Sequence, residues 1–282
     1  MITQILRPLA LSIFISVTLL PFKRAHGEIL PFLGLGFEFT SGDYGTGTRT
    51  NTVFVPVTIG ADLTDRWGVL LEIPYIYQDN TNVIGRQYNQ MQMQTTRMKT
   101  AAAMVPGSGS MGRTASSNPS AGRGGLGDLT LRIGYVAIEE TRALPRIKPV
   151  ASVKLPTADK DHGLGTGKFE ESLSVEFSKW MGDWYGFIEP GYTFQGSSPA
   201  LALKDYPFLD AGIGYQLTNR FRPLLIVKSS GAPQEGATAL LDARIKGKYQ
   251  TTAQTGIEAY GAKGITTSSP DYAVGLTIYY DF

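Results

Sequence analysis

The chain of 282 residues contains no cysteine and only two histidines, His26 and His162. The absence of cysteine excludes a disulfide framework and a thiolate metal site. Charge of one sign is not in excess either, because 26 basic residues stand against 24 acidic ones. We therefore expect no nucleic-acid partner, and we expect no cofactor, no metal site and no catalytic residues.

Long apolar runs are also scarce, and the one at residues 9–22 lies in an apparent secretory signal peptide. Arg7 precedes this run, Ala25 and Gly27 supply small residues for cleavage, and the run is short for a membrane helix. Cleavage after residue 27 would lower the 26 basic residues to 23 against 24 acidic ones. The predicted mature chain, residues 28–282, is thus nearly neutral.

The last eleven residues alternate between apolar and small or polar side chains, as a β-strand with one apolar face does. The apolar positions end in Tyr280 and Phe282. This segment resembles the closing strand of bacterial outer-membrane barrels, whose assembly machinery recognises an aromatic carboxy-terminus. The last strand of a soluble β-sandwich is the alternative.

The same alternation recurs in about twelve segments, and their connections alternate between short and long. The predicted strands lie at 33–39, 52–62, 67–78, 128–135, 146–155, 170–177, 184–194, 209–217, 221–228, 241–248, 257–259 and 272–282. Short turns are expected at 64–66, 139–144, 181–183, 218–220 and 250–251; longer loops at 41–49, 79–125, 158–168, 196–205, 231–236 and 264–269. An even number of strands with this sorting of loops predicts an all-β transmembrane antiparallel barrel, because a sandwich has no reason to sort its loops.

Five prolines fall inside the predicted strands, where each removes a donor from the hydrogen-bond ladder. We expect bulges or a locally frayed wall to accommodate them. They are Pro56, Pro74, Pro149, Pro190 and Pro223.

Charged residues occupy the face opposite the apolar one, and in lipid they would be costly, so they are expected to face the lumen. Counting along the strands predicts that Lys148 lies near Glu176, Lys154 near Glu170, and Arg244 near Asp242 or Glu258. They either form ion pairs that prop the wall or line a conduit that sorts solutes. The candidate lumen residues are Glu72, Arg132, Lys148, Lys154, Glu170, Glu176, Glu189, Asp210, Arg222, Lys228, Asp242, Arg244 and Glu258.

Three other motifs suggest chemistry but lack a necessary part. The segment 79–125, expected to be an extracellular or lumen-folded loop, is rich in methionine, a ligand of soft metals, but contains no histidine. Residues 163–168 resemble a phosphate-binding loop, yet His162 replaces its first glycine. His162 could serve a barrel-embedded lipid hydrolase, but no serine is identified as its nucleophile.

With the strands placed, the chain resembles the outer-membrane barrels known as meta-pathway phenol-degradation proteins or transporters. The resemblance spans nearly all of the mature chain, and segment 79–125 departs from it. The family name implies uptake of aromatic or other hydrophobic compounds. The matching motifs lie at 41–45, 55–57, 73–75, 125–129, 153–157, 163–167, 182–184, 191–194, 264 and 269–272.

The sequence therefore predicts an outer-membrane channel of a Gram-negative bacterium that passes a small organic solute by passive or gated diffusion. A largely closed structural or binding barrel is the alternative, and a lipid hydrolase is a third. The expected partners are outer-membrane lipid, the barrel assembly machinery and the solute. Neither the solute nor the oligomeric state follows from the sequence.

Overall fold

A computed structural model describes residues 29–79, 122–198 and 201–282, and these form thirteen β-strands. None of the described residues belongs to a helix that is long and apolar enough to cross a membrane. The predicted signal peptide and most of the methionine-rich segment lie outside the described residues. The strands are β1 (Leu30–Gly42), β2 (Thr50–Asp62), β3 (Trp67–Gln78), β4 (Arg123–Leu126), β5 (Thr130–Tyr135), β6 (Arg146–Lys154), β7 (Glu170–Met181), β8 (Trp184–Gln195), β9 (Tyr206–Tyr215), β10 (Phe221–Ser230), β11 (Leu240–Gln250), β12 (Thr255–Gly264) and β13 (Tyr272–Asp281).

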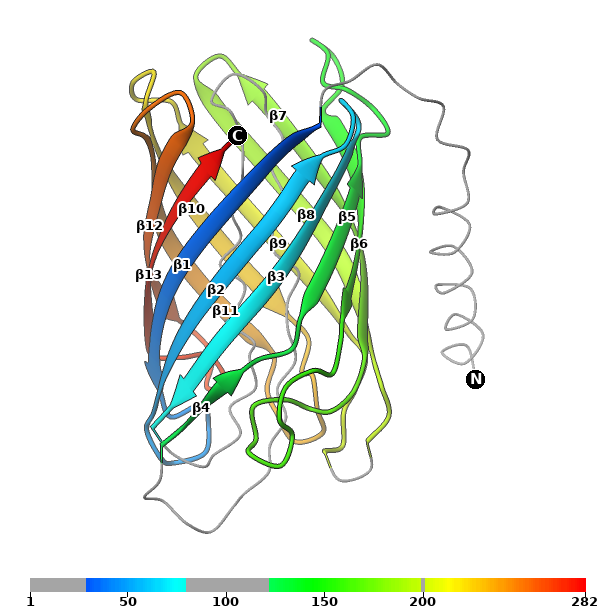
Figure 1. Cartoon of the computed structure of the whole chain (residues 1–282), viewed down its shortest axis with the longest axis vertical. Helices are drawn as coiled ribbons and strands as arrows, with labels where there is room; N and C mark the ends of the chain where they lie inside the picture. The colour runs from blue at the N-terminus through cyan, green and yellow to red at the C-terminus, as the bar shows by residue number, and fades with distance from the viewer. Residues whose placement is uncertain (1–28, 80–121, 199–200) are drawn as a thin grey trace.

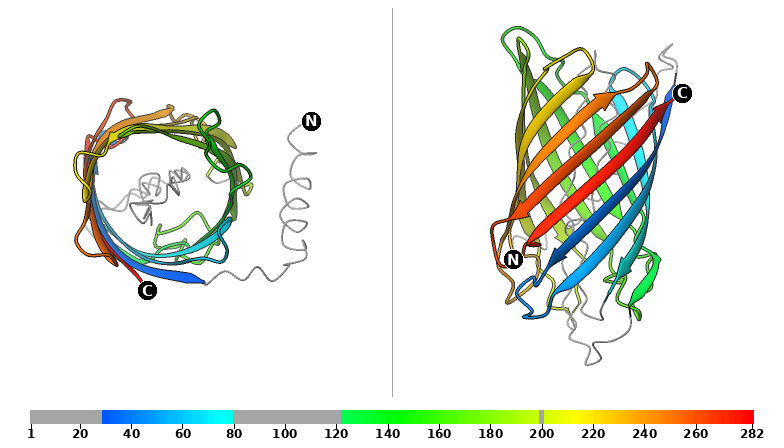
Figure 2. Two further views of the ribbon diagram at one scale, coloured as in Figure 1. Left: turned by 90° about the horizontal axis from the view of Figure 1, so that it is seen from above. Right: turned by 90° about the vertical axis from the view of Figure 1, so that its left-hand side faces the viewer.

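The strands pair antiparallel with their neighbours in the sequence, and β1 pairs with β13 to close a barrel (Figures 1 and 2). Leu33 lies opposite Tyr280 in this closing pair, and the amide of Phe282 donates to the carbonyl of Pro31 at 3.0 Å. Because β4 and β5 both pair with β3, they share one position in the wall. The described strands thus form a closed wall of twelve positions, as the alternation in the sequence predicts.

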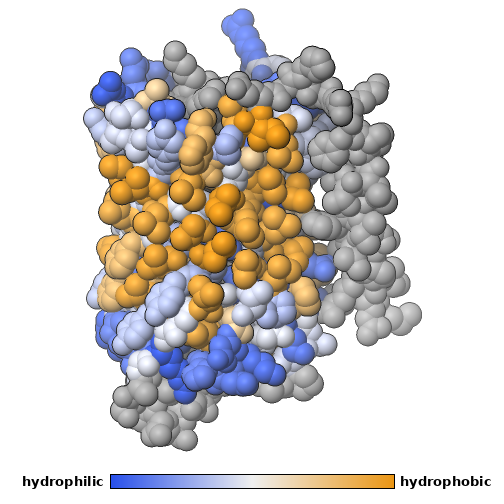
Figure 3. All heavy atoms as spheres, in the orientation of Figure 1, coloured by the Kyte–Doolittle hydropathy of each residue, from blue (hydrophilic) through white to orange (hydrophobic). Residues whose placement is uncertain are grey.

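One face of each strand is apolar and points outward, while the other is enclosed by the barrel. On β13, Val274, Leu276 and Ile278 are each 45–49% exposed, whereas Thr277 between them is buried. The space-filling view shows the result as an apolar band between two hydrophilic ends (Figure 3). A closed barrel satisfies its backbone groups internally, so this band suits a hydrocarbon surrounding.

The two ends of the barrel differ in their connections. We call the end with short connections, where β1 begins and β13 finishes, the turn end, and the opposite end the loop end (Figure 1). Aromatic pairs mark both margins of the apolar band. They are Trp67–Tyr135 and Trp184–Tyr215 toward the turn end, with ring centroids 4.7 and 5.0 Å apart, and Tyr192–Phe194 and Phe39–Tyr272 toward the loop end, at 5.0 and 6.2 Å.

Two of the prolines inside the strands, Pro56 and Pro190, interrupt the ladder without changing its register. Opposite Pro56, the pairing of β1 with β2 stops after Leu35–Val57 and resumes at Glu38–Phe54 in the same register. The pairing of β7 with β8 skips two positions around Pro190 in the same way. Of the two predicted alternatives, a bulge or a locally frayed wall, these two prolines therefore show a local interruption of the ladder and no bulge.

A bulge does occur between β4 and β5. The register of β3 shifts by one residue between Tyr75–Leu126 and Glu72–Thr130, and the amide of Gly127 still donates to Pro74 at 2.8 Å. An extra residue in one strand is the definition of a β-bulge. The strand begins at Arg123, so the predicted loop boundary at residue 125 is also corrected: its last residues are part of the wall.

Candidate functional site: the inner face of the barrel

The candidate site is the inner face of the wall, where the structure places the thirteen charged residues that the sequence singles out. Each alternates along its strand with outward apolar residues, and all except Lys228 are buried. Lys228 is nearly so, with 11% of its side chain exposed. The set is Glu72, Arg132, Lys148, Lys154, Glu170, Glu176, Glu189, Asp210, Arg222, Lys228, Asp242, Arg244 and Glu258.

Along β6 and β7 the charges pair across adjacent strands. The Nζ atom of Lys154 lies 3.0 Å from Glu170 and 3.9 Å from Asp128 on the bulge. Lys148 stands directly opposite Glu176 in the strand register. These neighbours are the ones that counting along the strands predicts, because cross-strand partners follow from the register alone.

Arg132 on β5 makes a longer reach. Its guanidinium lies 3.6 Å from Glu189 on β8, past both β6 and β7. The hydroxyl of Ser174 on β7 donates to the same carboxylate at 2.5 Å. This ion pair links strands that do not pair with each other.

A second group of charges follows β9 to β12. Lys228 lies 3.3 Å from Asp210, and Arg244 binds Asp242 through two hydrogen bonds of 2.9 and 3.1 Å. Of the two predicted partners of Arg244, the structure therefore selects Asp242. Arg244 also stands over the ring of Tyr260, 5.0 Å from its centroid, and the Tyr260 hydroxyl donates to Glu38 of β1.

Glu258 on β12 is shared by two lysines of β11. Lys246 contacts one of its oxygens, and Lys248 lies 3.1 Å from the other. Lys248 also stands 5.0 Å from the ring centroid of Tyr279. Basic and acidic residues are thus intermixed around the whole inner wall, which gives the site fixed local fields without a large excess of either sign.

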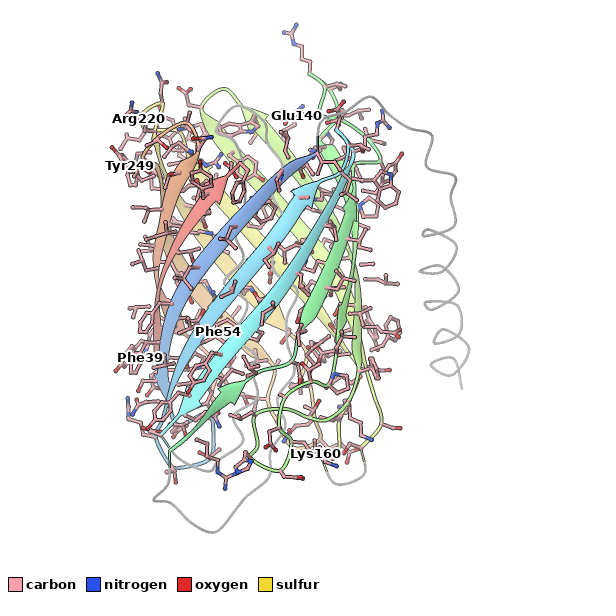
Figure 4. All side chains as sticks on the ribbon, in the orientation of Figure 1. Phe39, Phe54, Glu140, Lys160, Arg220 and Tyr249 are labelled. Carbon is pink, nitrogen blue, oxygen red and sulfur yellow. The ribbon has the colours of Figure 1, made fainter. Side chains whose placement is uncertain are left out.

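Sequence reasoning missed the apolar residues of the inner face, which gather toward the two ends. Phe54 on β2 and Ile76 on β3 form a buried cluster with Ala158 and Leu164 of the loop between β6 and β7, toward the loop end (Figure 4). Tyr185, Phe187 and Leu224 form another toward the turn end, as do Phe32, Leu70 and Tyr279. The strand residues among them have the parity of the inward face, which is a signal that the sequence carries.

Large inward side chains lie along the wall over glycines of the next strand. A Cβ atom added at Gly256 of β12 would fall 2.0 Å from the ring of Tyr279, and one added at Gly60 would fall 2.1 Å from the ring of Phe32. Gly191 accommodates Phe208 in the same way. Because the missing side chain leaves room beside the backbone, each ring can lie against the wall instead of projecting toward the barrel axis.

The segment that resembles a phosphate-binding loop is the loop 155–169 at the loop end. Its Leu164 is buried against the inner wall, and the amide of Ala158 donates to Asp128 at 2.9 Å. His162 is exposed and lies 2.6 Å from Asp159, and this hydrogen bond holds the pKa of the Asp159 carboxyl below its ordinary value. The loop therefore covers part of the inner face, and the histidine pair faces solvent.

Solved structures with the same fold are outer-membrane proteins. An outer membrane channel from Pseudomonas putida F1 matches with a TM-score of 0.62 and 12% identity, covering 94% of this chain and 100% of that one. The NanC porin matches at 0.56 with 8% identity (89% and 100% coverage), and the KdgM porin in complex with disordered oligogalacturonate at 0.51 with 7% (88% and 99%). At such identities the likeness shows the fold of an outer-membrane barrel.

No curated protein matches the chain by sequence. A family model does, over residues 100–282, and its description is "Putative MetA-pathway of phenol degradation". The match covers well over half of the chain and includes the wall from β4 to β13. The match shows that the chain belongs to this family.

Proposed function

We propose that the protein is an outer-membrane channel that passes a small organic solute by passive or gated diffusion. One observation carries the proposal. The closed barrel has an apolar exterior and an inner face of charged side chains that pair along the wall, where several large rings lie over glycines of the next strand. Fixed charges on the wall of a conduit discriminate between solutes by charge and hydrogen bonding.

An aromatic or otherwise apolar solute is the class we favour. The inner face carries Tyr185 and Phe187 toward the turn end and Phe54 toward the loop end, so a ring would find apolar contact at each end. The family description names phenol degradation, which agrees with a solute of this class. Outer-membrane lipid against the apolar band and the barrel assembly machinery at Tyr280 and Phe282 complete the proposed partners.

A largely closed barrel is the second candidate, favoured by the depth of burial of the charges. Glu176, Glu189 and Lys248 are wholly inaccessible in the structure, and Arg132 bridges to Glu189 past two strands. A network of this kind props a wall as well as it lines a conduit. In this reading the loops bind a ligand or the barrel strengthens the envelope.

A barrel-embedded lipid hydrolase is the third candidate, and it rests on the pair of His162 and Asp159. It makes a separate prediction, which is release of fatty acid from phospholipid with loss of activity in His162→Gln. The channel proposal expects no release of fatty acid by the unchanged protein or by His162→Gln, because the exposed pair then only shapes the loop.

Liposome swelling tests the proposed channel. Liposomes that contain the folded protein are diluted into iso-osmotic arabinose or raffinose, and the fall in light scattering is followed. We expect swelling in arabinose, with slower swelling in raffinose because the trisaccharide is larger. Swelling no faster than that of protein-free liposomes, with the barrel shown to be folded by heat modifiability, would support the closed barrel instead.

A further inference from the structure

Arg222 lies near the turn end of the inner face, at the second residue of β10. It is 2% exposed, and its side chain reaches past β9 to the rings of Trp180 on β7 and Tyr185 on β8. On β9, which lies between β10 and β8, Gly214 stands opposite both Tyr185 and Leu224. Figure 4 marks this end of the barrel with Arg220 and Tyr249.

The guanidinium of Arg222 is held by aromatic faces. Its Cζ atom is 5.1 Å from the centroid of each ring, and its Nε finds no hydrogen-bond partner among the residues that the structure describes. Six other inward cations have a carboxylate oxygen within 3.6 Å: Arg132, Lys154, Lys228, Arg244, Lys246 and Lys248. Ring faces position a guanidinium but accept none of its N–H groups in the plane, where a carboxylate would bind.

The surroundings of Arg222 are rich in positive charge. Lys248 stands directly opposite it in the pairing of β10 with β11, and like charges in such a position repel. Glu258 is already shared by Lys246 and Lys248. Among the described residues, Glu258 is also the one carboxylate among the main electrostatic neighbours of Arg222, so three cations depend on it. An added anion would therefore relieve repulsion as well as satisfy the buried guanidinium.

Apolar side chains adjoin the same place. Tyr185, which stacks on Arg222, belongs to the cluster with Phe187 and Leu224, and Trp180 and Ile226 pack against that cluster. An anion that carries a flat apolar group could thus bind its charge to Arg222 and lay the rest against these rings.

From these contacts we infer that Arg222 is the anchor of a binding site for an aromatic monocarboxylate. The inference rests on the proposed channel and narrows its solute to this class. The guanidinium binds the carboxylate through two parallel N–H donors, and the rings of Trp180 and Tyr185 hold the fork in place. The apolar cluster then favours an aromatic acid over acetate.

Titration calorimetry on the folded full chain in detergent tests the site, with benzoate as the probe. Benzamide has the same shape without the charge, and acetate has the charge without the ring. We expect saturable binding of benzoate, with benzamide and acetate at least about tenfold weaker. Arg222→Gln should weaken benzoate binding about tenfold or more, and Arg222→Lys should also weaken it because lysine lacks the planar fork.

Arg220→Gln is the matched control, since Arg220 lies two residues earlier in the exposed turn. It should bind benzoate as the unchanged protein does. Equal binding by Arg222→Gln, equal binding of benzamide, or no saturable benzoate binding by the folded barrel would each overturn the inference. Swelling in arabinose without benzoate binding would leave the channel standing and remove the site, whereas binding without swelling would keep the site and remove the channel.

Discussion

At the scale of single residues, Arg132 is the most informative side chain of the inner face. It is 2% exposed, and its electrostatic neighbours are Glu189, Asp210, Glu176 and Glu72. One guanidinium therefore balances carboxylates on several strands. Its removal leaves those carboxylates facing one another, and the cost depends on whether water can reach them.

The variant Arg132→Gln measures whether water reaches the carboxylates around this side chain. If the lumen excludes water, loss of the buried partner should lower the free energy of unfolding by about 3–5 kcal/mol. In a hydrated conduit the loss should stay below about 1 kcal/mol, and the current should shift toward cations. Urea unfolding gives the first quantity and the reversal potential in a KCl gradient gives the second.

Arg66→Gln, in an exposed turn, is the control for Arg132 and should change neither quantity. An unchanged stability together with an unchanged ion preference in Arg132→Gln would contradict the placement of this side chain on the inner face.

Residue positions were predictable from the sequence where the register alone decides them. Lys154 and Glu170 follow from counting back along two neighbouring strands. The partner of Arg132 did not follow, because Glu189 lies three strands away. Arg222 was assigned to the inner face from its parity, but its stacking did not follow, because Tyr185 lies two strands away and Trp180 three.

At the scale of strands, the glycines of the inner face determine how far the rings project. Gly256 of β12 lies under the ring of Tyr279. Gly261 of the same strand has the opposite parity and faces outward, where an added Cβ atom meets nothing within 4 Å. Gly256→Val should turn the ring of Tyr279 toward the barrel axis and reduce the conductance. Gly261→Val should leave it unchanged, since the side chain enters open space.

The double variant Gly256→Val with Tyr279→Ala tests whether Gly256→Val reduces the conductance by narrowing the lumen or by disturbing strand β12. Removing the displaced ring should restore the conductance that Gly256→Val loses. No recovery in the double variant would show that the valine disturbs the strand itself.

Elements were predictable because the apolar alternation and the sorting of connections repeat along the described chain. Two local features were not. The prolines gave no clue whether the wall bulges or only omits hydrogen bonds, and at Pro56 and Pro190 it omits them. The start of β4 at Arg123 follows a segment without alternation, so its boundary depends on pairing with Tyr75 to Gln78 of β3.

At the scale of the whole molecule, closure depends on the last strand. The amide of Phe282 donates to Pro31 of β1, and its ring stands against Tyr280 with centroids 5.0 Å apart. If the assembly machinery recognises this aromatic end, Phe282→Ala should lower the amount of heat-modifiable barrel in the outer membrane. The change removes little packing energy, because Phe282 is 62% exposed.

Phe169→Ala provides the comparison, since Phe169 is a similarly exposed phenylalanine at 57% and lies at the loop end. It should leave assembly unchanged. Equal amounts of folded barrel in all three proteins would argue against recognition of the terminal residue.

The central claim is that the barrel conducts, and single-channel recording in a planar bilayer tests it most directly. The account predicts discrete current steps from the folded protein in KCl, smaller steps in Gly256→Val, and steps of unchanged size in Gly261→Val. Insertion of the folded barrel without current steps would contradict the account and identify the charged inner face as a closed, structural network.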